Sequence, residues 1–293
     1  MFKKLCVIPA IALICTGIFQ TADAREKIVW PYICFPPTYI CEKDKCIGGI
    51  GWKIYQLIWK RMPEYEHETI LLPIKRVVNN MQQGKHYLFY GLYKTPEREK
   101  HLYFSVPCRI EPPLMVVVRK SDFKKFGGGE PVSFEALLKD TTLKTIMGSS
   151  VSYGAVFDAL FKKYEKSKNL YVDYRTDELG AYGLDLLLKN RIDYYISSKA
   201  VLHISKEKGI TDQIAYIPIK EQNIYQIGYI TAPKNEWGKR MLKKVNRALR
   251  KLIPTEAYFQ LFTPLVGENM VPELRRQFNS LILEPSKRQN PGW

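Results

Sequence analysis

The sequence contains few histidines and none of the common catalytic motifs. Only four of its 293 residues are histidine. There is no G-x-S-x-G sequence, which would place a serine nucleophile on a strand-to-helix turn, and no H-E-x-x-H sequence, which would hold zinc on a helix. The histidines are scattered among charged residues, which favours surface positions: His67, His86, His101 and His203. We therefore expect that the protein is not an enzyme.

Long hydrophobic runs are also missing after the first 24 residues. Two lysines precede an apolar stretch from Leu5 to Phe19, and an A-D-A sequence, typical of a signal-peptide cleavage site, ends at Ala24. The apolar stretch is shorter than the roughly 20 residues that a membrane span needs. We expect residues 1–24 to be a secretory signal peptide and the mature protein to be periplasmic. An N-terminal membrane anchor is the alternative.

Acidic residues are scarce relative to basic ones. The chain has 29 Asp and Glu against 45 Lys and Arg, a formal net charge of +16. Residues 1–24 carry two lysines and one aspartate, so their removal would leave +15. Such a charge attracts nucleic acids or anionic lipids without specificity. The basic residues are spread along the whole chain, however, and export disfavours a nucleic-acid partner. A cationic protein that binds envelope polyanions remains an alternative function.

Cysteine is rare, and four of the six residues follow the predicted signal peptide: Cys34, Cys41, Cys46 and Cys108. An even number in an oxidising compartment favours disulfides, and four cysteines allow three pairings. Cys41 and Cys46 bracket the short charged loop CEKDKC and are expected to pair, which leaves Cys34 for Cys108. The spacing does not match the paired C-x-x-C of zinc sites, and no histidine lies close by in the sequence. We expect neither a metal nor a cofactor.

The sequence does contain an alternation of short strands and amphipathic helices. From residue 28 to residue 93 the order is strand, helix, strand, helix, strand, which predicts an α/β layer. A second α/β run extends from Ser133 to residue 219. Segments near Pro113–Lys120 and Tyr225–Pro233 connect the two runs, which predicts two lobes joined twice. The predicted ranges are 25–116 and 226–275 for lobe I, 117–225 for lobe II, and 276–293 for a C-terminal helical extension and tail.

Seven short motifs follow one another in the order GWKIYQLI, LLPIKRVVNNMQQGK, TPEREKHLYFSVP, LMVVVRK, IMGSSVSYG, LLLKNRIDYYIS and VNRALRKL. In this order they resemble the type II periplasmic solute-binding proteins, specifically family 3, which includes binders of polar amino acids. Within that family the chain looks closest to a proteobacterial branch without an assigned ligand. The resemblance covers about Ile28 to Gly267.

The resemblance implies an α/β, two-lobed clamshell of the periplasmic-binding-protein type II fold, with two hinge crossovers. Such a protein captures a small-molecule ligand between its lobes for uptake or sensing. The partners implied are an inner-membrane permease of an ABC transporter or a sensor protein, and we expect a monomer. Because a few small dehydratases share the fold, a cleft enzyme of that kind is a further alternative.

The resemblance also assigns ligand contacts on both lobes. In this family the arginine of the T-x-E-R turn holds the ligand carboxylate, and Arg98 occupies that place. A guanidinium offers a fork of donors that matches a carboxylate; an exposed salt bridge with Glu97 or Glu99 is the alternative. On lobe II, Ser149 and Ser150 lie where GSSVSYG enters a helix. They would close on the same ligand group with free N–H groups and hydroxyls, and ordinary N-capping is the alternative.

Two departures from the family pattern argue against a plain α-amino acid. Ser198 stands where amino-acid binders place the acidic residue that holds the ammonium, and tyrosines flank Gly91 where small hydroxyl residues usually precede the arginine. We therefore expect an aromatic-lined pocket for a carboxylate-bearing ligand. Its expected aromatic residues lie near the ends of predicted strands, where open α/β sheets expose crevices: Trp30, Tyr32, Phe35, Tyr90 and Tyr93. Core packing is the alternative for each. Arg76 is a further candidate near the cleft, with a solvated helix face as its alternative.

Overall fold

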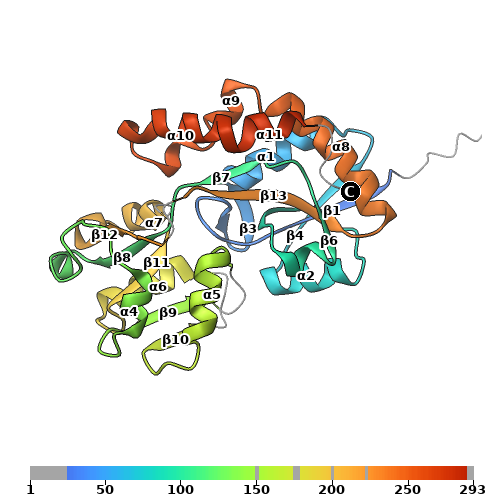
Figure 1. Ribbon diagram of the computed structural model, residues 1–293. Helices are drawn as coiled ribbons and strands as arrows, with labels where there is room; N and C mark the ends of the chain where they lie inside the picture. The colour runs from blue at the N-terminus through green and yellow to red at the C-terminus, as the bar shows by residue number, and fades with distance from the viewer. Residues whose placement is uncertain (1–24, 149–151, 174–178, 199–200, 222–223, 289–293) are drawn as a thin grey trace, which may run out of the picture.

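The computed structural model describes residues 25–148, 152–173, 179–198, 201–221 and 224–288. The predicted signal peptide therefore lies outside the described residues. The described chain forms two lobes connected by two extended segments, with α10 (Val271–Phe278) next to the two crossovers and α8 (Glu236–Leu252) farther from the second lobe (Figure 1). Within these ranges, no helix has both the length and the apolar composition that a membrane crossing requires.

The first lobe combines the N-terminal part of the chain with its C-terminal part. Strand β1 pairs with β4 in parallel, and β13 pairs with β5, β6 and β7 in antiparallel orientation. The order β1, α1, β4, α2, β5 confirms the predicted alternation of strands and helices. The elements of this lobe are β1 (Lys27–Tyr32), β2 (Ile40–Glu42), β3 (Lys45–Gly48), α1 (Ile50–Trp59), β4 (Glu66–Leu71), α2 (Ile74–Gln82), β5 (Phe89–Tyr93), α3 (Pro96–Glu99), β6 (Leu102–Phe104), β7 (Arg109–Glu111), β13 (Gln226–Pro233), α8 (Glu236–Leu252), α9 (Glu256–Phe259), α10 (Val271–Phe278) and α11 (Glu284–Lys287).

The second lobe is a smaller α/β unit. Strand β8 lies between β11 and β12 and pairs with both in antiparallel orientation, while β9 and β10 form a parallel pair. The elements of this lobe are β8 (Met115–Arg119), α4 (Phe134–Lys139), β9 (Thr145–Gly148), α5 (Ala155–Tyr164), β10 (Leu170–Asp173), α6 (Leu179–Leu188), β11 (Tyr194–Ser197), α7 (Val201–Glu207) and β12 (Ile214–Pro218).

Each lobe has its own hydrophobic core. The buried core residues of the second lobe all lie between Leu114 and Ile219, whereas the main core of the first lobe combines residues 28–110 with residues 230–282. The chain therefore passes between the lobes twice, from β7 to β8 and from β12 to β13. Because β7 and β13 are paired, with Gln226 opposite Glu111, the two crossovers lie side by side. This arrangement allows two rigid bodies to move about a common hinge.

The C-terminal helices belong to the core of the first lobe. The ring of Phe278 lies 5.4 Å from that of Phe259 and 5.9 Å from that of Phe262, and Ile282 is fully buried. The Arg250 side chain donates from Nε to the carbonyl of Ser286 at 3.0 Å. The segment predicted as a helical extension thus contributes buried apolar surface to this lobe.

A buried asparagine joins α8 to the segment that follows β6. Asn246 is 3% exposed, and its Oδ1 accepts a hydrogen bond from the Val106 N–H at 2.9 Å. Asn246→Ala would leave this N–H buried without an acceptor, which costs roughly 1–3 kcal/mol. We expect the free energy of unfolding in urea to fall by this amount, while Lys243→Ala on the exposed face of α8 leaves it unchanged. Equal stabilities of the two variants would contradict the role given to Asn246.

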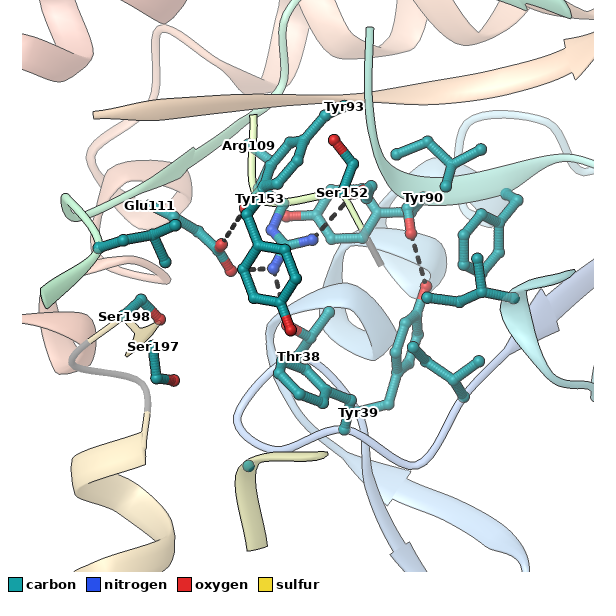
Figure 2. Close-up of a pocket in the computed structure, with 18 of the residues that line it drawn as sticks. Thr38, Tyr39, Tyr90, Tyr93, Arg109, Glu111, Ser152, Tyr153, Ser197 and Ser198 are labelled. Carbon is teal, nitrogen blue, oxygen red and sulfur yellow. Dashed lines mark hydrogen bonds and ion pairs between the residues drawn. The ribbon is translucent and has the colours of Figure 1, made fainter. Parts of the chain in front are cut away.

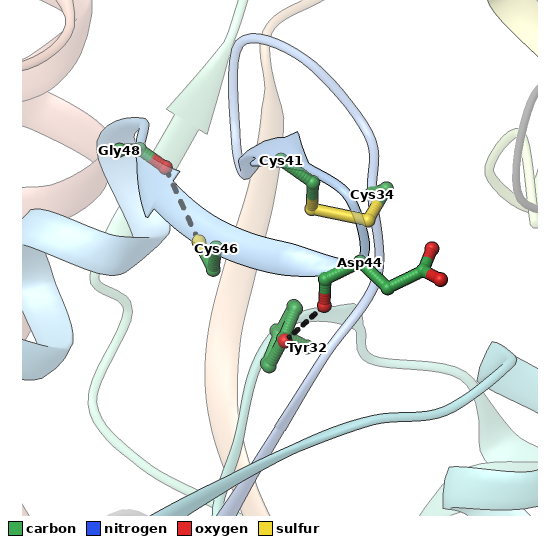
Figure 3. Close-up of a disulfide and its surroundings, with 6 residues drawn as sticks. All are labelled: Tyr32, Cys34, Cys41, Asp44, Cys46 and Gly48. Atoms are coloured by element: carbon green, nitrogen blue, oxygen red, sulfur yellow. Dashed lines mark hydrogen bonds between the residues drawn. A yellow bond between two sulfur atoms is a disulfide. The ribbon is translucent and has the colours of Figure 1, made fainter.

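The predicted disulfide pairing is wrong. In the structure Cys34 is bonded to Cys41, with the Cα atoms 5.6 Å apart (Figure 3), and Cys46 and Cys108 are free. The predicted partner of Cys34 is inaccessible, because Cys108 is fully buried in the core and its thiol donates to the carbonyl of Gly228. The predicted partner of Cys41 is its cross-strand neighbour Cys46. Sequence spacing could not distinguish this neighbour from Cys34, because the loop before β2 folds back and brings the Cα atom of Cys34 within 5.6 Å of that of Cys41.

Candidate ligand-binding cleft

A cavity of about 140 Å³ lies between the two lobes and is lined by both. The first lobe contributes Phe35, Thr38, Tyr90, Tyr93, Arg98 and Arg109, among others. The second lobe contributes Ser152, Tyr153, Tyr195, Ser197 and Ser198, among others. Figure 2 shows Tyr153 in front of the group around Arg109, with Ser197 and Ser198 to one side of it. Any molecule in this cavity would contact both lobes at once, so its binding would depend on how far the hinge is closed.

Arg98 lies in the wall of this cleft. Thr95 caps the short helix α3, since its Oγ1 accepts from the N–H of Arg98 at 3.3 Å, and the guanidinium donates to the carbonyl of Tyr93 at 2.9 Å. Burial lowers the pKa of the Arg98 side chain, and the negative charge of Asp158 on α5 acts in the opposite direction. The guanidinium of Arg98 therefore interacts electrostatically with a carboxylate of the second lobe, across the cleft.

The alternative interpretation of Arg98, an exposed salt bridge to a neighbouring glutamate, is not what the structure shows. Glu97 pairs with Lys100 at 2.6 Å, and Glu99 pairs with Lys94 at 2.8 Å. Both glutamates are thus occupied by lysines on the outer face of the turn. The arginine is left to point inward, toward the carbonyl of Tyr93.

A second arginine, which the sequence analysis missed, lies at the base of the cleft. Arg109 donates to the carbonyl of Gly91 at 3.0 Å and to Oγ1 of Thr38 at 3.3 Å, and it forms an ion pair with Glu111. The second carboxylate oxygen of Glu111 accepts from the hydroxyl of Tyr93 at 2.6 Å. The ion-paired side chains are only 12% and 9% exposed. Figure 2 shows this network as dashed lines that converge on the guanidinium.

Two glycines make room for Arg109. Gly91 has φ +110°, and a Cβ atom there would lie 2.6 Å from Nη1 of Arg109. On the adjacent strand β13, a Cβ atom at Gly228 would lie 2.9 Å from Cδ of the same arginine. A glycine inside a strand often marks such a close approach, so these two residues were the available sequence signal. They do not reveal which side chain fills the space.

The second-lobe wall is organised by Asp158. Its carboxylate accepts from the hydroxyl of Ser152 at 2.6 Å and from the N–H of Tyr153 at 2.7 Å. The hydroxyl of Tyr153 in turn accepts from the N–H of Gly148 at 3.0 Å. These bonds fix the loop before α5 so that Ser152 and Tyr153 line the cleft. The predicted ligand contacts Ser149 and Ser150 lie outside the described residues.

The expected aromatic lining is divided between the cleft and the core. Phe35, Tyr90 and Tyr93 line the cavity, and the ring of Tyr90 lies 5.9 Å from the guanidinium carbon of Arg109. Trp30 and Tyr32 do not line it, and their prediction as ligand contacts is corrected here. Trp30 is fully buried and donates to Nδ1 of His67 at 3.0 Å.

The position of these two residues follows from the period of the strand. Residues 28, 30 and 32 are all buried and share one face of β1, because side chains alternate along a strand. That face packs on α1, where Tyr55 lies 4.8 Å from Trp30. The hydroxyl of Tyr32 donates to the carbonyl of Asp44 at 2.8 Å, toward the β2–β3 hairpin.

Of the two remaining predicted ligand contacts, one lines the cleft and the other does not. Ser198 lines the cleft. Arg76 is exposed on α2 and is not part of the lining, so the solvated helix face is the correct interpretation. Among the described residues that line the cleft, Glu111 is the only acidic one, and both of its oxygens are engaged by Arg109 and Tyr93. The cleft therefore offers positive charge more readily than negative charge to a ligand.

The fold is similar to that of several solved structures. A histidine kinase sensor domain with similarity to periplasmic binding proteins aligns with a TM-score of 0.65 and 16% identity, covering 83% of this chain and 96% of that one. An ancestral arginine-binding protein bound to arginine aligns with a TM-score of 0.63 and 20% identity, covering 83% of this chain and 100% of that one. The substrate-binding protein of an amino acid ABC transporter aligns with a TM-score of 0.61 and 19% identity, covering 82% of this chain and 98% of that one. At these identities the likeness shows the fold, and the predicted two-lobed α/β clamshell is confirmed.

No protein with a curated description matches the sequence. The sequence pattern of the bacterial extracellular solute-binding proteins, family 3, matches residues 32–267. This range includes most of both lobes and all of the described residues named above as lining the cleft. The chain therefore belongs to family 3 of the bacterial extracellular solute-binding proteins.

Proposed function

We propose that the protein captures a small carboxylate-bearing ligand between its lobes, for uptake or sensing. The observation that carries this proposal is the position of Arg98. A guanidinium has five N–H donors, and in the described part of the chain the Arg98 side chain has one hydrogen-bond acceptor, the carbonyl of Tyr93. Its other donors lie in the cleft wall, where a ligand carboxylate would form short, charge-assisted hydrogen bonds.

The same site argues against an ammonium group on the ligand. A cation would need a carboxylate in the lining, and Glu111 is already bound to Arg109 and Tyr93. Removing Glu111 from that ion pair would leave Arg109 buried without its counter-charge, which is costly. The residue at the place where amino-acid binders carry an acid is Ser198. We therefore propose an organic acid without an amine, in contrast to the polar amino acids of many relatives.

The rest of the cavity favours a compact, partly flat ligand. Its volume of about 140 Å³ is below the roughly 300–1,000 Å³ of pockets for drug-sized ligands. The flat side chains of Phe35 and Tyr153 line it from opposite lobes and would stack on a ring or an aliphatic body. Ser198, and the predicted Ser149 and Ser150, would supply hydrogen bonds from the second lobe.

Contacts from both lobes would shift the protein toward a closed form, which is the signal that a partner reads. We propose a monomer in the periplasm that presents this form to an inner-membrane permease or a sensor, without a nucleic-acid partner and without turnover of the ligand. The proteobacterial branch of the family is proposed on the sequence motifs alone.

The proposal is tested by thermal unfolding with matched sets of small molecules. Each set contains a carboxylic acid, its primary amide and its α-amino derivative, with aromatic and aliphatic bodies; peptides and sugars complete the panel. We expect at least one acid to raise the melting temperature, and its amide and α-amino counterparts to have no effect at the same concentration. A panel in which only amino acids, peptides or sugars stabilise the protein would overturn the proposal.

A further inference from the structure

Three cysteines meet at the β2–β3 hairpin and the loop that precedes it (Figure 3). Cys34 is bonded to Cys41 on β2, and Cys46 on β3 is the cross-strand partner of Cys41 and carries a free thiol. Cross-strand Cα atoms are about 4.5–5.5 Å apart in antiparallel pairs, which lies inside the roughly 4.4–6.8 Å that a disulfide requires. Cys41 can therefore be bridged to either of the other two residues by side-chain rotation, with the hairpin backbone in place.

We propose that Cys41 exchanges its disulfide between Cys34 and Cys46, which makes the hairpin a thiol–disulfide switch next to the loop that lines the cleft with Phe35, Thr38 and Tyr39. The Cys46 thiol first loses its proton to water. Its thiolate sulfur attacks Sγ of Cys41, the Cys34–Cys41 bond breaks as the Cys41–Cys46 bond forms, and Cys34 leaves as a thiolate that takes up a proton. One disulfide and one thiol are present before and after the step, so no oxidant or reductant is consumed.

The surroundings of Cys46 make this exchange slow near neutral pH. The thiol is partly buried and donates to the carbonyl of Gly48 at 3.4 Å, and desolvation raises its pKa. Tyr32 of β1 and Tyr55 of α1 face it, and the flanking turn carries two acidic and two basic residues, Glu42 to Lys45. Because the thiolate is the nucleophile, the rate should rise as the pH approaches the pKa of the thiol.

The other cysteine among the described residues, Cys108, does not compete. Cys108 is fully buried, and burial raises the pKa of its thiol to about 12. It lies in the core of the first lobe, where its thiol donates to the carbonyl of Gly228. Cys108 therefore reacts only when the lobe unfolds, which makes it an internal indicator that the exchange takes place in folded protein.

The exchange would change the cleft because the Cys34–Cys41 bond closes the loop that carries Phe35, Thr38 and Tyr39. All three line the cavity, and Thr38 also accepts from Arg109. After exchange the loop loses its covalent closure and is held by hydrogen bonds alone, such as Thr38 N–H to the carbonyl of Phe35 at 2.9 Å and Arg109 to Oγ1 of Thr38 at 3.3 Å. The loop then samples more conformations, which weakens binding. The exchange itself is independent of the ligand, whereas its effect on affinity rests on the proposed function.

Peptide mapping tests the exchange directly, because trypsin cleaves after Lys43 and Lys45. Cys34 and Cys41 fall on one peptide, residues 28–43, and Cys46 falls on another, residues 46–53. Folded, non-reduced protein is incubated at about pH 9, where thiolate forms readily, then acidified, treated with N-ethylmaleimide and digested. We expect a growing fraction in which the two peptides are cross-linked and Cys34 carries the label, while Cys108 stays unlabelled.

Two serine variants complete the test. Cys46→Ser should contain only the bond within peptide 28–43 at every time point. Cys34→Ser, oxidised with glutathione disulfide, should contain the cross-linked peptides. The proposal is overturned if wild-type protein keeps a single pairing throughout the incubation, or if Cys34→Ser retains two free thiols at Cys41 and Cys46.

The effect on the cleft is measured with the acid that gives the largest thermal shift in the panel. We expect it to bind Cys34→Ser at least severalfold more weakly than Cys46→Ser. If cross-linked peptides form but no acid binds either variant, the exchange stands and the proposed function fails. If the acid binds both variants equally, the link between the switch and the cleft is refuted while the proposed function stands.

Discussion

Arg98→Ala is expected to abolish the stabilisation by carboxylic acids while leaving the unliganded protein folded. A hydrogen bond to a charged group contributes about 1.5–3 kcal/mol, so the dissociation constant should rise roughly 10- to 150-fold. The fold should tolerate the change, because Arg98 is only half-buried and lies in a four-residue helix at the cleft wall, outside the hydrophobic core. Isothermal calorimetry gives the affinity, and urea unfolding gives the stability of the unliganded form.

Arg76→Ala is the matched control for this experiment. It also removes an arginine from the first lobe, but Arg76 is exposed on α2 and does not line the cleft. Both variants lower the net charge by one unit, so nonspecific attraction of anions by the cationic surface would weaken binding equally in the two. Equal affinities of Arg98→Ala and Arg76→Ala would refute the assignment of Arg98 as the carboxylate ligand. Arg98→Lys should fall between Arg98→Ala and wild type, because lysine keeps the charge and loses the fork geometry.

Arg109→Met is expected to lower the stability of the protein much more than a surface substitution. The variant would leave Glu111, which is 9% exposed at its side chain, without its counter-charge. Removing one partner of a buried ion pair costs about 3–5 kcal/mol. The carbonyl of Gly91 and the hydroxyl of Thr38 would lose a donor as well. Urea or thermal unfolding of the unliganded protein measures the effect.

The double variant Arg109→Met/Glu111→Gln separates the ion pair from other roles of Arg109. Replacing both charges removes the uncompensated carboxylate, and the amide oxygen of the introduced glutamine side chain would still accept from the hydroxyl of Tyr93. We therefore expect the double variant to recover most of the stability lost in Arg109→Met. A double variant as unstable as Arg109→Met would mean that the packing of Arg109 between Gly91 and Gly228, and not its charge, stabilises this part of the lobe.

The elements and their order could be predicted because the signals for them are local. A short apolar run defines β1, and Thr95 with Pro96 specifies the start of the turn that places Arg98. The same local signals could not assign Trp30, because a strand pattern reveals which residues share a face but not which face meets the core. In the structure the face of β1 that carries Trp30 meets the core, where Trp30 packs against Tyr55.

The sequence by itself determined the alternation of strands and helices in two runs, since periodicity and capping act over short stretches of chain, and the family resemblance of its motifs implied the inward arginine of the T-P-E-R turn. Only the tertiary structure decided what lies opposite that arginine and at the base of the cleft. At the base of the cleft, Arg109 donates to Thr38, which is 71 residues away in the sequence. The same arginine packs against Gly228 on another strand. The partner of Cys41 also depends on the tertiary structure, because the loop before β2 places Cys34 next to it and the hairpin places Cys46 opposite it.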